Sequence, residues 1–285
     1  MIKRRDVLDS PKLQELKRNR RRRLQNKIFF YVGSVLAIFI ILVFISRINK
    51  LNISVINISG NKIIDTEQIK EIVSRDISGY YLFFIPKSNF LIYPKNKIEK
   101  DLAEKYRRLT NIKFNLDGAE TLSISLSERE GKYIWCGETL PDINLNPEYN
   151  TCSFLDSTGY AFDTSPYFSG NVYFKFFGPL TENNFTPILW SKIISFKEAL
   201  TEMGLKPASL YIKPDGDIEI YLSSNILPPD SPKVIFKNDF DLEKATENMQ
   251  AVIHTEPLQA DLKSKINSLL YIDLRFGNKV YYKFR

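Results

Sequence analysis

The sequence predicts an α+β protein in which a single N-terminal transmembrane helix precedes two folded parts, the second rich in β-strands. Three observations predict this fold class. An uncharged apolar run follows a basic tail, helix-like and strand-like patterns alternate over residues 50–130, and short strand patterns with flanking helices fill residues 131–285. With 285 residues, the chain is long enough for two small domains beyond one membrane span.

The predicted transmembrane helix covers residues 28–46. Between Ile28 and Ile45 there is no Asp, Glu, Lys or Arg, and Arg47 ends the run. Such a run is long enough to cross the hydrocarbon core as a helix. A cleavable signal peptide also has a basic start and an apolar centre, but the exit between Phe44 and Ile48 offers no small-x-small cleavage site. A retained anchor is therefore favoured.

The basic tail, residues 1–27, predicts the orientation of this helix. It has eleven Lys or Arg against three acidic residues, a net charge of +8, whereas the whole chain has +7 and the remainder therefore −1. The positive-inside rule places the tail in the cytoplasm and the rest outside. Runs of arginine can also neutralise nucleic-acid phosphates. Beside a membrane span, however, such charge is typically a topology signal that touches anionic lipid, so we expect a phospholipid bilayer and no nucleic acid as partner.

Residues 50–130 predict the element order β-α-α-β-β. A strand from Leu51 to Ile58, with a bulge or twist, ends at the Gly60-Asn61 turn. A capping box at 65–68 opens a short helix that stops near Gly79. The second helix starts around Pro94 and has the apolar stripe Ile98, Leu102, Tyr106 and Leu109. Alternating strands at 112–116 and 122–126, joined around Asp117-Gly118, close the unit.

Residues 131–285 predict a β-rich domain with flanking helices. Its expected elements are a strand at 133–135, a strand-turn-strand at 154–162, a helix from Thr186 to Met203 stopped by Gly204, a hairpin at 210–222 around Pro214-Asp215-Gly216-Asp217, a helix at 242–253 and a closing hairpin at 271–284.

These residues resemble a known family. The succession of Ile58-Ser-Gly60-Asn61, the helix at 66–69, the segment Tyr81 to Pro86, a second helix, the strand 121–126 and Glu128-Arg129 is similar to the POTRA domain of the bacterial division proteins FtsQ and DivIB. A short basic tail and one span before it are also that family's layout. The proline that commonly follows the Glu-Arg pair after one residue is absent here. The strand-turn-strand and the closing hairpin resemble the family's second, β domain.

The resemblance covers nearly the whole chain and rests on the order of elements. It implies a non-enzymatic bitopic scaffold of the divisome, in the cytoplasmic membrane at the division septum, that holds FtsB/DivIC-like and FtsL-like subunits. A POTRA-bearing secretion or assembly factor is the alternative among binding proteins, although neither a barrel nor further POTRA repeats follow. A membrane-anchored cell-wall hydrolase is the alternative among enzymes.

Residues suited to catalysis are few. The single histidine, His254, falls in a helical stripe, so a metal site with two histidines is excluded. No phosphate-cradling Gly-rich loop is present. Glu128 and Glu130 share one strand face and could serve a glycosidase, but neighbouring surface acids are commonplace. We expect no catalytic residue, no metal and no cofactor.

The two cysteines, Cys136 and Cys152, lie at the ends of a Pro- and Asn-rich excursion. Outside the membrane they meet oxidising conditions, and a disulfide there would contribute about 3 kcal/mol for a loop of this size. Two buried free thiols are the other interpretation, and the disulfide is favoured.

The predicted partner-binding residues form the terminal strand: Val280, Tyr281, Tyr282, Lys283 and Phe284. An exposed edge strand can recruit an extended segment of a partner by β-augmentation, and tyrosines with polar tips suit such a surface. Lys283 and Arg285 could instead be guards against unwanted pairing. Partner binding is favoured because the FtsQ and DivIB resemblance implies it for this C-terminal region.

Overall fold

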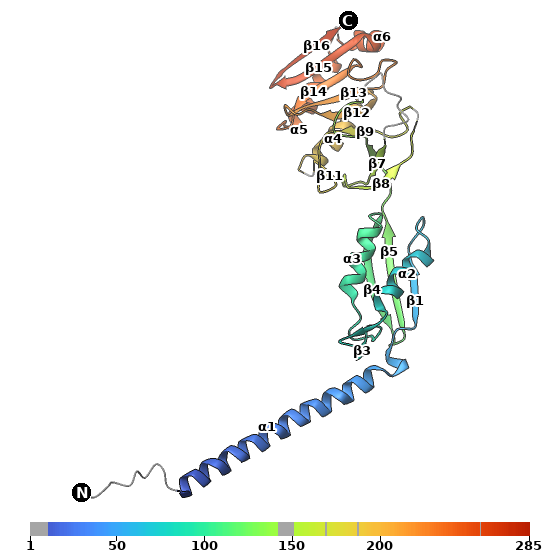
Figure 1. Cartoon of the computed structure of the whole chain (residues 1–285). Helices are drawn as coiled ribbons and strands as arrows, with labels where there is room; N and C mark the ends of the chain where they lie inside the picture. The colour runs from blue at the N-terminus through green and yellow to red at the C-terminus, as the bar shows by residue number, and fades with distance from the viewer. Residues whose placement is uncertain (1–10, 142–150, 169, 187, 257) are drawn as a thin grey trace, which may run out of the picture. The chain divides into compact units, whose positions relative to one another are not determined.

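The computed structural model describes residues 11–141, 151–168, 170–186, 188–256 and 258–285 (Figure 1). The start of the predicted tail and residues 142–150 of the predicted excursion lie outside the described residues. Two compact units divide the chain, Met1–Ser127 and Glu128–Arg285. The boundary falls three residues before the one expected after residue 130.

Helix α1, Pro11–Ser46, contains the apolar run of the first unit. From Glu15 to Ser46 it is long and apolar enough to cross a membrane, and among the described residues no other helix is. The helix begins well before Ile28 because its basic stretch consists mainly of good helix formers without glycine or proline. Its large apolar side chains, such as Phe29 and Phe44, are exposed.

The rest of the first unit has the element order β-α-α-β-β with a small hairpin inserted between its helices. Its elements are β1 (Val55–Ser59), α2 (Thr66–Ile77), β2 (Tyr80–Tyr81), β3 (Ile85–Pro86), α3 (Lys95–Lys105), β4 (Leu109–Asp117) and β5 (Thr121–Glu128). The sheet has the order β1-β5-β4, with β1 parallel to β5, and β2 pairs with β3. Ile69 and Ile72 of α2, Ile98 and Leu102 of α3 and Leu122 of β5 are almost fully buried in one core.

Two expectations for this unit are corrected. The first strand begins at Val55, not Leu51, because 49–51 form a 3₁₀ turn whose following residue, Asn52, donates its side-chain amide to the carbonyls of Ser46 and Ile48. Leu109 belongs to β4 and Tyr106 is only the C-cap of α3, so neither continues the helical stripe, because α3 ends at Lys105. Only the first half of the predicted capping box is observed: the Asp65 carboxylate accepts from the backbone N–H of Glu67 at 3.3 Å, while Gln68 Oε1 accepts from the Tyr106 hydroxyl at 3.1 Å.

Gly60 shows why the turn after β1 needs glycine. Its φ is +95°, and a Cβ at this position would lie 1.9 Å from the carbonyl oxygen of Leu126 in β5. The absent side chain therefore allows the chain to leave β1 in close contact with the neighbouring strand.

The second unit is built on a nine-stranded sheet of order β16-β15-β14-β13-β12-β9-β6-β7-β8. Its strands are β6 (Tyr133–Trp135), β7 (Cys152–Leu155), β8 (Ala161–Ser165), β9 (Lys175–Phe177), β12 (Pro207–Ile212), β13 (Asp217–Leu222), β14 (Lys233–Lys237), β15 (Leu269–Phe276) and β16 (Lys279–Phe284). Three pairs are parallel, β12 with β9, β6 with β9 and β14 with β15. The short strands β10 (Leu180–Thr181) and β11 (Asn184–Phe185) pair with each other.

Three helices complete this unit: α4 (Trp190–Glu202), α5 (Leu242–Ile253) and α6 (Leu258–Lys265). Phe196 of α4 and Met249 of α5 are fully buried in one core with Phe176, Leu210 and Phe236 of the sheet. Because side chains alternate along a strand, Lys175, Ser209 and Tyr221 lie on the opposite face of the sheet from this core.

The predicted helix at 186–203 begins later than expected, at Trp190. The residues before Trp190 form a turn after β11. In this turn Thr186 has a φ of +39°, and the Thr186 carbonyl accepts from the N–H groups of Leu189 and Trp190. Gly204, with a φ of +84°, ends the helix as predicted. The strand β14, the helix α6 and the strands β9 to β11 were not among the elements predicted from sequence.

Candidate functional site: the outer edge of the terminal strand

The terminal hairpin places β16 at one end of the nine-stranded sheet. Gly277, with a φ of +68°, and Asn278 form its turn, and the Asn248 side-chain amide donates to the Gly277 carbonyl at 2.8 Å. The hairpin is antiparallel, with Ile272 opposite Tyr282 and Asp273 opposite Tyr281. All five predicted partner-binding residues therefore lie on a strand that pairs with β15 along one edge and, within the described ranges, has no strand on the other, called the open edge below.

The register identifies which backbone groups face outward. Both register shifts of the hairpin put the extra residue in β15, so β16 keeps regular alternation. The N–H of Arg285 donates to the carbonyl of Ser268 at 2.7 Å, on the β15 side. Backbone groups of alternate residues point in opposite directions. The N–H groups of Tyr281 and Lys283 thus face β15, and those of Val280, Tyr282 and Phe284 face the open edge.

The side chains of β16 divide between the two faces of the sheet. Val280 and Phe284 are half-buried against the core. Tyr281, on the other face, is 48% exposed, and its ring meets that of exposed Phe276 edge-on with centroids 5.1 Å apart. Lys283 is exposed. The open edge is therefore flanked by aromatic side chains that a paired segment could cover.

An ion-pair network holds β15, the strand that supports this edge. Arg275 donates through Nε to the buried Asp273 carboxylate at 2.9 Å and through Nη1 to Asp217 of β13. The hydrogen bonds to Asp273 and Asp217 outweigh burial and raise the pKa of the Arg275 guanidinium. The guanidinium of Arg285 donates to the carbonyl of Asp230. Arg285, which was predicted as a guard against unwanted strand pairing, thus also holds the end of β16 to the chain at Asp230.

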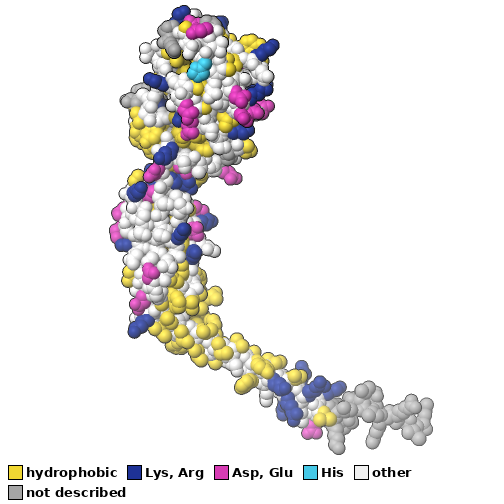
Figure 2. Space-filling view, turned by 180° about the vertical axis from the view of Figure 1, so that it is seen from behind, with side chains coloured by type: hydrophobic (Ala, Val, Ile, Leu, Met, Phe, Trp, Pro, Cys, Tyr) yellow, Lys and Arg dark blue, Asp and Glu magenta, His cyan; other side chains and the backbone are white. Residues whose placement is uncertain are grey.

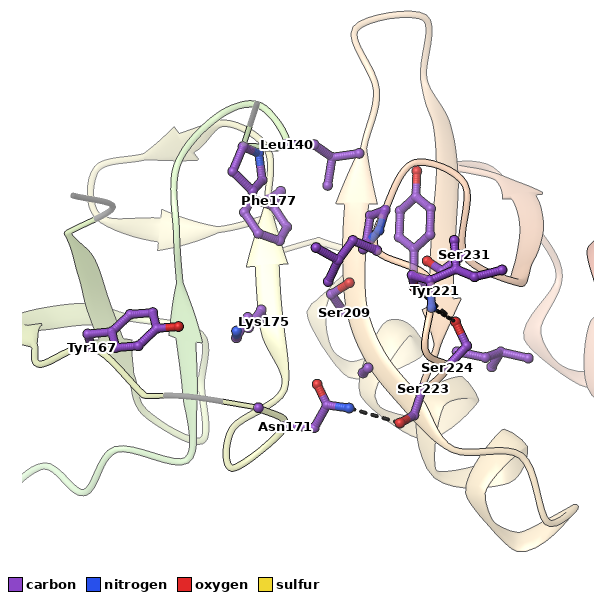
Figure 3. A pocket seen from close by; sticks show the side chains of 17 residues that line it. Leu140, Tyr167, Asn171, Lys175, Phe177, Ser209, Tyr221, Ser223, Ser224 and Ser231 are labelled. Carbon is purple, nitrogen blue, oxygen red and sulfur yellow. Dashed lines mark hydrogen bonds between the residues drawn. The ribbon is translucent and has the colours of Figure 1, made fainter. Parts of the chain in front are cut away.

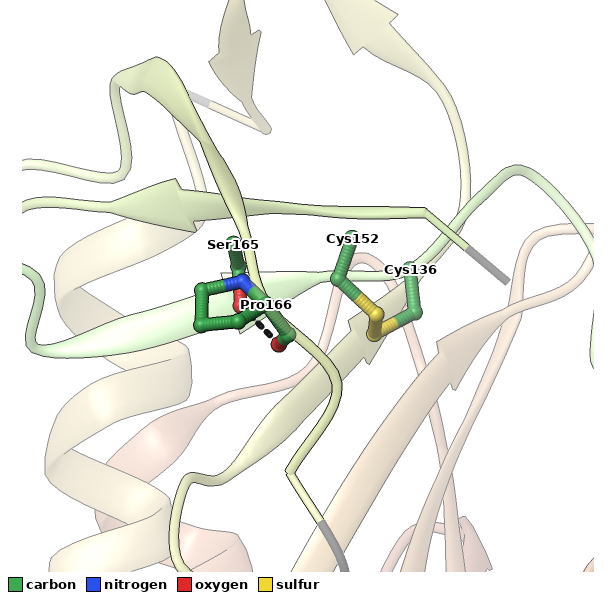
Figure 4. Close-up of a disulfide and its surroundings, with 4 residues drawn as sticks. All are labelled: Cys136, Cys152, Ser165 and Pro166. Atoms are coloured by element: carbon green, nitrogen blue, oxygen red, sulfur yellow. Dashed lines mark hydrogen bonds between the residues drawn. A yellow bond between two sulfur atoms is a disulfide. The ribbon is translucent and has the colours of Figure 1, made fainter. Parts of the chain in front are cut away.

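The two cysteines lie on adjacent strands or at their ends (Figure 4). Cys136 directly follows β6 and Cys152 opens β7, and their sulfur atoms are 2.01 Å apart, as in a disulfide. The antiparallel pairing of β6 with β7 brings the two residues together across 16 positions of sequence. The bridge thus closes the base of the excursion.

A cavity of about 350 Å³ lies on the sheet face opposite the helices (Figure 3). Apolar side chains such as Phe177 and Leu227 line it together with Lys175 and Ser231. Burial lowers the pKa of the Lys175 ammonium. The Ser231 hydroxyl is buried, and none of the described residues forms a hydrogen bond with it. Sequence patterns gave no signal for this cavity, because its lining comes from segments far apart in the chain.

The residues considered for catalysis are dispersed. His254 is exposed at the end of α5. Glu128 ends β5, while Glu130 is exposed and lies 3.6 Å from the Lys132 ammonium. Within the described part of the chain, no group of three or more His, Cys, Asp or Glu side chains could hold a metal ion.

No protein-family model matches the chain, and no curated protein matches it as a relative. Function is therefore inferred from the chain's own sequence and geometry.

Proposed function

We propose that this chain is a non-enzymatic, single-pass membrane scaffold of the bacterial division machinery. In this proposal α1 anchors it in the cytoplasmic membrane at the septum, with the tail inside and both folded units outside. The outward edge of β16 captures an extended segment of an FtsB/DivIC-like or FtsL-like subunit by β-augmentation.

Three features support the proposal. The first is the layout of a basic tail, one apolar helix and two folded units. The second is the β-α-α-β-β order of the first unit with a β1-β5-β4 sheet, which resembles a POTRA domain. The third, which carries the binding mode, is the open edge of β16 with three outward N–H groups.

The test uses substitutions at one outward position of the full-length, tagged chain, co-expressed with the FtsB/DivIC-like and FtsL-like subunits of the same bacterium. Tyr282→Pro removes an outward N–H and leaves the β15 pairing intact, so partner capture should be abolished. Tyr282→Val keeps the N–H and a strand-forming side chain, so capture should largely persist.

A proline at the neighbouring position provides the contrast. Tyr281→Pro removes an N–H that faces β15 and should damage the hairpin itself, because that group belongs to the hydrogen-bond ladder. Circular dichroism and tryptophan fluorescence separate that outcome from a binding defect. A folded Tyr282→Pro variant that captures its partners at the wild-type level would place the binding surface elsewhere. Fluorescence microscopy of a tagged chain tests the septal location.

A further inference from the structure

The small hairpin of β2 and β3 presents large apolar side chains to solvent. Leu82 and Phe83 at its tip are 79% and 90% exposed. The exposed apolar residues of this hairpin and of the segment after it, here called the hairpin patch, are Tyr80, Leu82, Phe83, Phe84, Leu91 and Ile92. Figure 2 shows hydrophobic side chains gathered where α1 joins the rest of its unit. Contiguous exposed apolar surface of this kind marks an interaction site.

The turn of the hairpin has an unusual sequence for its backbone. The N–H of Phe84 donates to the carbonyl of Tyr81 at 3.0 Å, and the two central residues, Leu82 and Phe83, have φ values of +47° and +67°. Two positive φ values define a type I′ turn, which usually carries Asn-Gly. Large apolar residues are strained there. Residues held in strained backbone cluster at functional sites, which indicates that these side chains serve a contact outside the unit.

Hydrogen bonds tie this region to the C-terminal end of α1. The Ser46 carbonyl accepts from the side-chain amides of Asn52 at 3.0 Å and Asn89 at 3.3 Å. Arg47 donates through Nε to the Phe84 carbonyl at 3.2 Å, and its guanidinium lies 5.7 Å from the Tyr80 ring centroid. The hairpin patch therefore lies beside the point where the apolar helix ends.

The two segments that carry and adjoin the patch contain basic and no acidic residues, although Lys50 also lines a surface hollow with Asp117 and Glu120 of the β4–β5 turn. No Asp or Glu occurs between Ser46 and Ile64 or between Ile77 and Ile98. The first of these stretches contains Arg47 and Lys50, and the second contains Lys87. The Lys87 ammonium lies 5.9 Å from the Tyr81 ring centroid. Aromatic rings beside basic side chains, as at Arg47 with Tyr80 and Lys87 with Tyr81, are the composition of a membrane interface, where the rings sit at headgroup level and the cations meet phosphate.

We propose that the hairpin patch inserts into the lipid leaflet from which the C-terminal end of α1 emerges, as a second membrane contact of the chain. The inference rests on the proposed membrane anchor, because α1 brings the patch to the bilayer surface. Its occupant is phospholipid, with Leu82 and Phe83 among the acyl chains and Arg47 and Lys87 at the phosphates.

The experiment measures depth with nitroxide spin labels on the full-length chain in bilayer discs that contain phospholipid and this protein only. Single cysteines replace Phe83, Leu91, Leu36 or Ile63, with the native cysteines kept oxidised. Leu36 is in the middle of the apolar run and reports on the anchor. Ile63 is 70% exposed and follows the C-terminal end of β1, whereas Asn52 precedes the N-terminal end of that strand, so Ile63 serves as the control away from the patch. Accessibility to oxygen and to a water-soluble nickel chelate gives the depth of each label.

Labels at Phe83 and Leu91 should be at least several-fold less accessible to the nickel chelate than the label at Ile63, and more accessible to oxygen. Equal chelate accessibility at Phe83, Leu91 and Ile63, with Leu36 buried in lipid, would overturn the hairpin proposal and leave the anchor intact. A Leu36 label exposed to the chelate would instead reject the anchor, and with it the membrane insertion of the patch. Leu91 keeps the test independent of the strained turn.

Discussion

Replacing Asp156 by asparagine should destabilise the second unit by about 2 kcal/mol, because it removes a charge from a nearly buried ion pair. Asp156 is 6% exposed and closes the turn between β7 and β8. Its Oδ1 accepts from the N–H of Thr158 at 2.8 Å, the hydroxyl of Thr158 at 2.6 Å and the N–H of Tyr160 at 3.1 Å. Its Oδ2 accepts from the Arg129 guanidinium.

The expected loss of unfolding free energy depends on which interactions each variant removes. In Asp156→Asn an amide group can still accept the turn bonds, but the charge that pairs with Arg129 is gone. Removing one partner of a fully buried pair costs about 3–5 kcal/mol. Arg129 keeps 24% of its side chain in contact with water, and its guanidinium lies 4.4 Å from the Tyr160 ring centroid, so the cost is smaller. Asp156→Ala also loses the three turn bonds, about 1 kcal/mol each, and should cost about 5 kcal/mol.

The effect should depend on pH in a defined direction. Burial by itself would raise the pKa of Asp156, but the hydrogen bonds from Thr158, Arg129 and Tyr160 together hold it below the ordinary value of 3.8. A carboxylate whose pKa is lowered by folding contributes stability above its unfolded pKa, and this contribution is lost as the pH falls through the folded value. The difference between wild type and Asp156→Asn should therefore be full at pH 7 and shrink below pH 3.8.

Urea unfolding of the full-length chain in detergent, followed by tryptophan fluorescence, provides the assay. Both tryptophans of the chain, Trp135 and Trp190, belong to the second unit, and the Trp190 indole donates to the carbonyl of Ser157 within this turn at 2.9 Å. Asp239→Asn, at an exposed carboxylate of the same unit, is the matched control and should change stability by less than about 0.5 kcal/mol. A loss for Asp156→Asn that equals the control, or that is constant from pH 7 to pH 3, would refute the reasoning.

Three further predictions concern other parts of the chain. Peptide mass spectrometry without reductant should find Cys136 linked to Cys152, and Cys136→Ser should lower stability by about 3 kcal/mol; two free thiols in material prepared without reductant would reject the bridge. An impermeant thiol reagent added to spheroplasts should label Glu256→Cys and spare Glu15→Cys, since the basic tail faces the cytoplasm; labelling of both would contradict a single span. Gly60→Ala should cost about 3 kcal/mol or more, because its Cβ meets Leu126 at positive φ, and raise hydrogen exchange in β1 and β5. Gly118→Ala has a similar φ of +79° with nothing within 4 Å, so an equal loss there would show that contact with Leu126 is not the cause.

The elements with strong local signals could be predicted from the sequence. Helix α5 has the predicted bounds because its apolar stripe follows a capping residue, Asp241, whose carboxylate accepts from the N–H of Lys244 at 3.2 Å. The β12–β13 and β15–β16 hairpins were predicted from glycine turns between alternating strands.

Elements that depend on distant pairing could not be predicted. Strand β14 is a short apolar run next to prolines, and its place between β13 and β15 is settled by partners elsewhere in the chain. Leu51 and Ile53 alternate as a strand would, but the Asn52 side chain caps α1 there instead.

The candidate binding edge was also predictable only in part. The identity of the edge strand could be predicted, whereas the direction of each N–H could not, because it depends on the register of the hairpin and on which strand carries the extra residues.

The bridge between Cys136 and Cys152 also provides a position where a tag can be inserted. Because it fixes both ends of the excursion to adjacent strands, sequence placed between them adds length to a loop whose base is already closed. Lengthening a loop costs little free energy, about 0.6 kcal/mol for each doubling. An epitope or a small fluorescent reporter inserted after Thr139, an exposed residue between the two cysteines, should therefore leave the sheet intact. Such an insertion would make the position of this chain visible in living cells without a fusion to the strand that carries the proposed binding edge.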